Sequence, residues 1–230
     1  DFEHIDNNDF LVVNQLSVEH NSEAGARRPD VVLFVNGLPL AVIELKNPLD
    51  LETDIWEAFN QLETYKEHIT RLFFYNVALA IADGSDARAG SLTADRERFL
   101  KWRSINGEEL DPHGSFGHAQ TLIEGLFNKK NLLDVIQYFT IFVAGKRTIK
   151  MFPGYHQFYA VTKAYHRAIT ASQTGGDGKG GLMWHTQGSG KSYEMACLAG
   201  KLIKSSELKN PTVVLVTDRN NLDDQLYDIF

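Results

Sequence analysis

The residue pair Asn36-Gly37 places the strongest constraint on how this chain folds. It separates two apolar runs, residues 31–35 and 38–43. Asn-Gly between two such runs predicts a β-hairpin, because both residues readily adopt the backbone conformation that a two-residue turn requires. The chain therefore contains at least one pair of antiparallel strands, joined at residues 36 and 37.

Charged residues end both arms of this predicted hairpin. Asp30 precedes the first strand, and Glu44 and Lys46 end the second, where residues two apart share a face. Charges on an otherwise apolar strand are costly unless they pair or bind a metal. Two carboxylates offer the oxygen ligands that Mg²⁺ prefers, and such a metal activates water and screens a phosphate. The pattern predicts metal-dependent phosphodiester cleavage, with Asp30 and Glu44 as metal ligands and Lys46 beside the attacking water.

The register of the hairpin decides whether these carboxylates meet. A strict two-residue turn pairs Asp30 with Ile43, so the Asp30 side chain would point away from Glu44. The chemistry requires the other register. We therefore predict a one-residue offset, from a three-residue loop 36–38 or a bulge near Pro39, that sets Asp30 opposite Glu44.

A helix is predicted after this hairpin, capped by Thr53 or Asp54. Gln61 and Tyr65 lie four residues apart on one side of it, within reach of the strand that carries Glu44. With Pro29-Asp30 and Glu44-Leu45-Lys46, the pattern resembles the PD-(D/E)xK nuclease superfamily. The Gln-x-x-x-Tyr pair resembles the additional motif of nucleases fused to DNA helicases. The resemblance implies that Gln61 and Tyr65 brace the site or contact DNA; the candidate catalytic residues are Asp30, Glu44, Lys46, Gln61 and Tyr65.

The rest of the first 150 residues reads as alternating strands and helices, and we place a domain boundary after residue 150. The predicted elements are a strand at 11–18, a loop at 21–27, a buried strand at 76–82, an edge strand at 87–93, a helical turn at 97–102, helices within 118–143 and a short strand at 147–151. Residues 151–230 start with a predicted helix at 155–170.

A second motif lies in residues 182–203. A predicted strand, Leu182–His185, leads into a glycine-rich loop ending Gly-Lys-Ser and then into a helix with an apolar stripe at 195, 198, 199, 202 and 203. This order predicts a phosphate-binding loop for ATP, although His185 occupies the position of the first consensus glycine. Backbone N–H groups would cradle phosphates, Lys191 would reach the outer ones, and the Ser192 hydroxyl would bind Mg²⁺. The candidate loop residues are Thr186, Gln187, Gly188, Ser189, Gly190, Lys191 and Ser192.

Two neighbouring segments support a DNA motor. Gln157 near the start of helix 155–170 resembles the adenine-reading Q motif of superfamily 2 helicases. Residues 212–217 read as a buried strand, and the run at 217–225, TDRNNLDDQ, resembles helicase motif Ia, which follows the DNA backbone.

Charge and composition limit the partners. The net charge is −7, and residues 1–150 carry 15 basic and 23 acidic side chains, so a broad basic DNA-binding surface is not expected. The apolar runs are too short to span a membrane, and no secretory signal opens the chain. The single Cys197 excludes an internal disulfide and fits a reducing compartment.

These features predict an α/β protein in which a PD-(D/E)xK nuclease domain, residues 1–150, precedes the beginning of a RecA-like superfamily 2 helicase domain, residues 151–230. This order resembles the R (restriction) subunit of type I restriction–modification enzymes. The resemblance implies a cytoplasmic bacterial or archaeal protein that uses ATP and Mg²⁺, translocates and cuts double-stranded DNA, and works with modification and specificity subunits.

No Walker B sequence or later helicase motif follows, so we expect the 230 residues to be the N-terminal piece of a longer protein. We expect this piece not to hydrolyse ATP by itself. Two alternatives remain open at this stage. One is a stand-alone helicase–nuclease of DNA repair. The other is a catalytically idle DNA-binding or assembly module, against which the intact Asp30, Glu44 and Lys46 argue.

Overall fold

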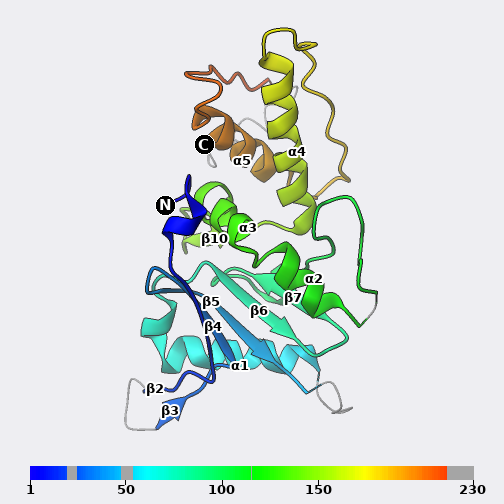
Figure 1. The fold of residues 1–230 in the computed structure, drawn as a ribbon. Coiled ribbons are helices and arrows are strands. Elements are labelled where there is room, and N and C mark those ends of the chain that lie inside the picture. The colour runs from blue at the N-terminus through cyan, green and yellow to red at the C-terminus, as the bar shows by residue number, and fades with distance from the viewer. Residues whose placement is uncertain (20–24, 48–53, 115, 217–230) are drawn as a thin grey trace.

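A mixed six-stranded sheet forms the centre of the molecule (Figure 1). A computed structural model describes residues 1–19, 25–47, 54–114 and 116–216. The strand order is β1-β4-β5-β6-β7-β8; β5 and β6 are parallel, and the other neighbours are antiparallel. The bounds are β1 Phe10–Asn14, β4 Val31–Val35, β5 Leu38–Leu45, β6 Ala78–Ala82, β7 Ala87–Gly90 and β8 Leu100–Lys101. The prediction of an α/β protein is confirmed.

Helices cover both faces of this sheet. Helix α1 (Ile55–His68) packs on one face, and α2 (His118–Gly125) and α3 (Lys129–Asp134) lie on the other (Figure 1). Alternate residues of each strand turn to opposite faces, so Val42 packs toward α1 while Ile43 packs toward α2 and α3. Asp54 caps α1, as predicted, by accepting the Trp56 N–H. Glu44 and Lys46 share the parity of Val42 and therefore lie on the α1 face.

The hairpin contains the predicted bulge. Asn36 and Gly37 form a two-residue turn with φ angles of 52° and 77°. Val35 pairs with Leu38 and Phe34 with Pro39, but Leu33 pairs with Ala41, which leaves Leu40 as the extra residue. The register beyond the bulge pairs Val31 with Ile43, so Asp30 comes opposite Glu44. The predicted one-residue offset is confirmed.

Several smaller elements differ from their predictions. The first strand stops at Asn14 because Gln15 has a positive φ of 51°, which ends an extended strand. Where a loop was predicted, β3 (Ala26–Arg27) pairs with β2 (Val18–Glu19) in a separate small sheet. Strand β7 is not an edge strand, since β8 pairs along its outer side.

The segment after α3 also departs from the predicted helix. A π-helical turn, Val135–Phe139, ends it, and β9 (Ile141–Val143) then pairs with β10 (Ile149–Met151). The apolar spacing at 132–139 is helical, but three β-prone residues at 141–143 pair with a partner strand at residues 149–151. The predicted helical turn at 97–102 is a 3₁₀ turn at Arg96–Arg98, followed by β8.

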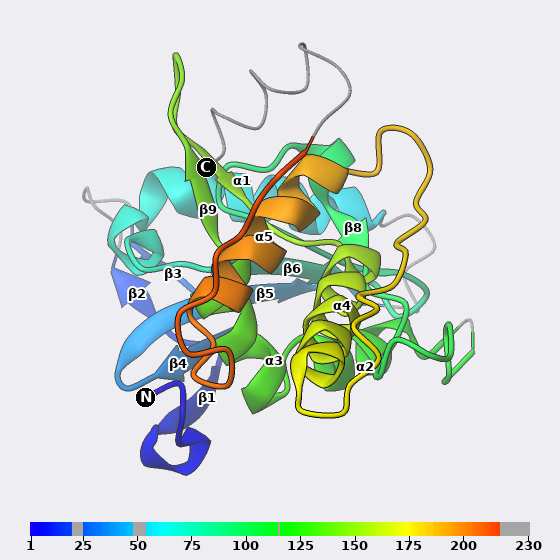
Figure 2. The same cartoon turned by 90° about the horizontal axis from the view of Figure 1, so that it is seen from above.

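Helices α4 (Tyr155–Ser172) and α5 (Lys191–Ile203) pack side by side (Figure 2). Phe158 of α4 contacts the rings of Trp102 and Phe139, and the Tyr193 hydroxyl of α5 donates to the Phe139 carbonyl. One apolar core therefore continues across residue 150. The division into two domains there remains a prediction.

Neither strand predicted beside the phosphate loop is present among residues 182–216. Residues 182–185 and 212–216 belong to no ladder, and Leu182 and Trp184 are 88% and 85% exposed. An extended segment needs a hydrogen-bonded neighbour to form a strand, and these segments have none there. The motif Ia run at 217–225 lies outside the described residues. In the part of the chain described, no helix is both long enough and apolar enough to cross a membrane.

Candidate functional site

Asp30, the residue directly before β4, is held in place by three hydrogen bonds. Its Oδ2 accepts the backbone N–H of Leu45 at 2.8 Å, and its Oδ1 accepts the side-chain amide of Gln15 at 2.5 Å. Its own N–H donates to Glu44 Oε2 at 3.4 Å. The bulged register therefore brings the two predicted metal ligands together, and the Leu45 bond fixes the orientation of the Asp30 carboxylate.

The environment of the Glu44 carboxyl group disfavours a negative charge. Its side chain is 2% exposed. Burial, and next the charge of Asp30, raise the pKa of Glu44 to about 8, although the nearby Lys46 acts in the opposite direction. Near neutral pH this pair therefore binds a proton or a cation much more favourably than two isolated carboxylates do.

Lys46 begins a directional chain of hydrogen bonds that ends at the backbone beside Asp30. The Lys46 ammonium donates to Gln61 Oε1 at 2.7 Å, and the Gln61 amide donates to the Tyr65 hydroxyl at 2.6 Å. The Tyr65 hydroxyl donates to the Arg28 carbonyl at 3.2 Å. Each bond fixes the donor and acceptor roles in the next one. All five candidate nuclease residues thus belong to one connected site between β4, β5 and α1.

The donor set fits a hard divalent cation. Two carboxylates lie together, and one of them is buried where only a proton or a cation can neutralise it. No group of three or more His, Cys, Asp or Glu side chains suited to a metal occurs among the described residues. A Mg²⁺ ion here would therefore need water, backbone or phosphate oxygens to complete its coordination.

The phosphate loop is organised differently, through its backbone. Gly188 and Gly190 have φ angles of 81° and 85°, and α5 starts directly after them. The Lys191 ammonium donates to the carbonyls of Thr186 at 2.7 Å and His185 at 3.1 Å, so it lies over its own loop. The remaining predicted residues, Gln187, Ser189 and Ser192, lie in the loop or in the first turn of α5.

Two contacts anchor this loop to its surroundings. The Gln157 amide donates to the Ser189 carbonyl at 2.8 Å, and its oxygen accepts the Gly154 N–H at 2.8 Å. His185 Nδ1 lies 2.7 Å from Glu194 Oε1, and Glu194 is 1% exposed. In this structure Gln157 therefore links the start of α4 to the loop, and its role toward adenine remains a prediction.

Sequence reasoning missed Glu194 because it misplaced the buried face of α5. The predicted apolar stripe includes Ile203, which is 56% exposed. The buried side instead carries Tyr193, Glu194, Cys197 and Lys201, and the Lys201 ammonium pairs with Asp134 Oδ2 at 2.8 Å. A glutamate and a lysine seven residues apart on one side of the helix are the only sequence sign of this polar face.

Comparison with known proteins points to one family along the whole chain. A family model described as type I restriction enzyme R protein N terminus matches residues 1–98, and a SWI2/SNF2 ATPase model matches residues 156–230. The chain is 50% identical, over its full length, to the type I restriction enzyme HindI endonuclease subunit of Haemophilus influenzae. It is 38% identical, again over its full length, to a putative type I restriction enzyme endonuclease subunit of Methanocaldococcus jannaschii, MjaIXP.

A type I restriction enzyme endonuclease subunit of Staphylococcus aureus is 31% identical over 97% of the chain. The chain spans 22% of the Haemophilus and Staphylococcus proteins and 23% of the Methanocaldococcus protein.

Proposed function

Since the chain belongs to the family of type I restriction enzyme R subunits, we propose that residues 1–150 form the PD-(D/E)xK nuclease of such an enzyme. Asp30 and Glu44 bind Mg²⁺, and Lys46 positions the attacking water or stabilises the developing charge on the phosphate. The observation that carries this proposal is the buried Glu44 carboxyl, next to Asp30, with a pKa of about 8.

The surrounding residues prepare this pair for cleavage of a phosphodiester. When bound, Mg²⁺ supplies an activated water and screens the negative phosphate. The Leu45 N–H keeps the Asp30 carboxylate in one orientation. Gln61 keeps the Lys46 ammonium at the site, and Tyr65 keeps Gln61 in the orientation that accepts from it. Gln61 and Tyr65 therefore act as positioning residues.

Residues 151–230 begin, on this proposal, a RecA-like superfamily 2 motor. The backbone of residues 186–190 would hold the phosphates of ATP, with Lys191 toward the outer ones and Ser192 as a ligand of Mg²⁺. The Lys191 ammonium would have to leave the loop carbonyls for this role. Gln157 would face adenine once one of its two present hydrogen bonds is exchanged.

The complete protein would be the subunit of a site-specific deoxyribonuclease. It would translocate double-stranded DNA with ATP and cut it, in complex with modification and specificity subunits in the cytoplasm of a bacterium or archaeon. The chain spans only 22–23% of the length of these relatives. We therefore propose the activities of the complete protein from the family membership and the site geometry together.

Replacing Glu44 with Gln in the complete subunit tests the nuclease assignment. The neutral amide removes a metal ligand, so Mg²⁺-dependent cleavage should fall about a thousandfold or more, because the metal supplies several kcal/mol of charge stabilisation. ATP hydrolysis should continue at the normal rate. Glu63→Gln, on the exposed side of α1, is the matched control and should cut normally. Normal cleavage by the Glu44→Gln enzyme would end the assignment.

A further inference from the structure

A row of cations crosses the sheet from the proposed metal ligand. The strand register pairs Glu44 with Ile81, Ile81 with Arg88 and Arg88 with Lys101. Directly paired residues point to the same face, so Arg88 and Lys101 lie on the α1 face at the level of Glu44. With neighbouring strands about 4.8 Å apart, Arg88 starts about 10 Å from Glu44 across the sheet.

Beside this row, two arginines stack on one tryptophan. The Arg88 guanidinium lies 5.1 Å from the centre of the Trp56 ring, and the Arg96 guanidinium lies 5.6 Å from it. Trp56, Arg88 and Arg96 are called the Trp56 cluster below. Trp56 lies five residues before Gln61 on α1, a rise of about 7.5 Å along the helix. Trp56 therefore lies about one and a half helical turns from Gln61, which accepts from Lys46.

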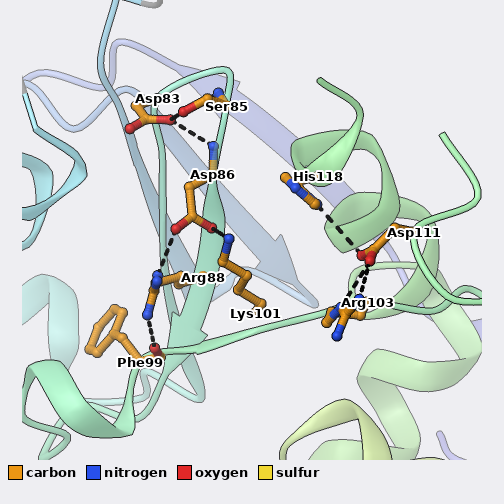
Figure 3. A network of polar contacts seen from close by, with 9 residues as sticks. All are labelled: Asp83, Ser85, Asp86, Arg88, Phe99, Lys101, Arg103, Asp111 and His118. Carbon is orange, nitrogen blue, oxygen red and sulfur yellow. Dashed lines mark hydrogen bonds and ion pairs between the residues drawn. The ribbon is translucent and has the colours of Figure 1, made fainter. Parts of the chain in front are cut away.

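The two arginines differ in whether a carboxylate pairs with them. Figure 3 shows Asp86 between Arg88 and Lys101, at 3.0 Å and 3.1 Å, with Arg88 also reaching the Phe99 carbonyl. Asp86 thus balances one of two cations. Arg96 donates to the neutral Asn60 amide oxygen at 2.8 Å and lies 5.7 Å from the Phe59 ring.

Arg96 is exposed, and no carboxylate pairs with its side chain among the described residues. A planar guanidinium that is already oriented by an amide and two rings, and that keeps donors open to solvent, is well suited to a phosphate oxygen. Its fixed position lowers the conformational entropy that binding costs. Other exposed cations, Arg98 among them, also lack a carboxylate partner among the described residues, so Arg96 is distinguished by its orientation on Asn60 and two rings and not by its charge.

We propose that the Trp56 cluster is a second DNA-backbone contact, with Arg96 as the phosphate-binding residue and Arg88 and Trp56 as its support. The inference rests on the proposed nuclease function. Trp56 lies about 7.5 Å from Gln61 along α1, and Arg88 about 10 Å from Glu44 across the sheet, which is the rise of two or three nucleotides along one strand at about 3.4 Å per step. The cluster fixes the path of the strand that enters the site, and α1 supplies a supporting residue to each contact, Trp56 beside Arg96 and Gln61 beside Lys46.

The test measures binding of the complete R subunit, without ATP, to a short duplex over a range of salt concentrations. Arg96→Gln should weaken binding about threefold to tenfold and reduce the slope of log affinity against log salt by about 1, because one phosphate contact is lost. Single-turnover cleavage by the assembled enzyme should slow by a similar factor, while ATP hydrolysis stays unchanged. Arg96→Lys should restore the slope but only part of the cleavage rate.

Arg98→Gln is the matched control. Arg98 lies on the same 3₁₀ turn and is exposed, but in the described chain it stacks on neither Trp56 nor Phe59. Equal salt slopes for Arg96→Gln, Arg98→Gln and the unmodified protein would overturn the proposal. The proposal would also be overturned if Arg96→Gln reduced only the thermal stability of the protein, which would indicate a purely structural contact. The same holds if it reduced only assembly with the other subunits, which would indicate a protein contact.

The two variants distinguish failure of this proposal from failure of the nuclease assignment. Glu44→Gln should lose cleavage and keep the full salt slope, whereas Arg96→Gln should lose one unit of slope and keep measurable cleavage. If Glu44→Gln cuts normally, the nuclease assignment fails, and the slope measured for Arg96→Gln still decides whether the cluster binds DNA.

Discussion

The nuclease site and the phosphate loop are built on opposite principles. At the nuclease site, strands paired on both sides and a packed helix bring side chains from distant residues into one hydrogen-bonded chain. At the phosphate loop, consecutive residues supply the site, and Lys191 donates to carbonyls of its own loop. The first site depends on register across the sheet, and the second on local backbone conformation.

The difference predicts how each site responds to damage. A site made of linked side chains loses function in steps as links are removed, because each neighbour partly retains the geometry. A loop in which a single ammonium, that of Lys191, would contact the phosphates has no such reserve. The same contrast applies to stability, since the Glu44 carboxyl is buried and Lys191 is exposed.

The largest effect is expected for Lys191→Ala. Loss of the only loop ammonium should reduce ATP hydrolysis by the complete subunit about a thousandfold or more, because charge stabilisation at the phosphates disappears. Cleavage far from the recognition site should disappear with it, although Asp30, Glu44 and Lys46 are intact. Lys204→Ala, at the other end of α5, is the control. Distant cleavage by the Lys191→Ala enzyme would show that cutting does not depend on the motor.

A smaller effect, on stability, is expected for Glu44→Gln. Without metal, folded Glu44 retains a proton between its ordinary pKa of 4.5 and about 8, whereas the unfolded chain releases it. Its stabilisation is therefore full below about pH 4.5 and is lost as the pH rises through about 8. Gln does not titrate, so above pH 8 the variant should be more stable, by on the order of 5 kcal/mol for a pKa raised from 4.5 to about 8. The difference should vanish near pH 4.5.

Denaturant titrations with and without Mg²⁺ measure this effect. Binding to the folded state alone stabilises it by about 2.7 kcal/mol at a hundred times the dissociation constant. Mg²⁺ should therefore stabilise the unmodified protein and leave Glu44→Gln unchanged. A variant less stable than the parent at pH 8.5 would contradict the buried, ionisation-resistant carboxyl described above.

The smallest effect is expected for Tyr65→Phe. The substitution removes the hydroxyl that accepts from Gln61 and donates to Arg28, but it leaves the Lys46–Gln61 bond in place. Cleavage should fall about tenfold, against a hundredfold or more for Lys46→Ala, because removal of an outer partner in such a network costs less than loss of the inner group. Equal losses in the two variants would place Tyr65 in direct contact with the reacting groups.

The sequence predicted the nuclease half well where two constraints acted on the same residues. The Asn36-Gly37 turn and the need to bring Asp30 to Glu44 could only be satisfied together by an offset, and the structure has a bulge at Leu40. The helical spacing of Gln61 and Tyr65 likewise predicted that both lie within reach of the strand that carries Glu44, and the structure shows Gln61 bonded to Lys46 beside it. The roles of these residues in cleavage remain predictions.

Prediction failed where one local pattern stood alone. Residues 182–185 have the composition of a strand, but strand formation depends on a neighbour that composition does not reveal. The apolar spacing of α5 was matched to a helical stripe, whereas Tyr193, Glu194 and Lys201 are buried through specific polar bonds. These partners lie outside α5, those of Tyr193 and Lys201 more than 50 residues earlier, and helical periodicity does not identify them.

The extra residue at Leu40 has a consequence for the length of this hairpin. Without Leu40, a regular two-residue hairpin would still set Ala41 opposite Leu33 and Glu44 opposite Asp30, because Ala41 would then follow Pro39 directly. Removing one residue of β4 instead, such as Leu33, would set Asp30 opposite Ile43, and its carboxylate would leave the face that carries Glu44. The bulged arm of the hairpin can therefore lose one residue and keep the site, whereas the other arm cannot.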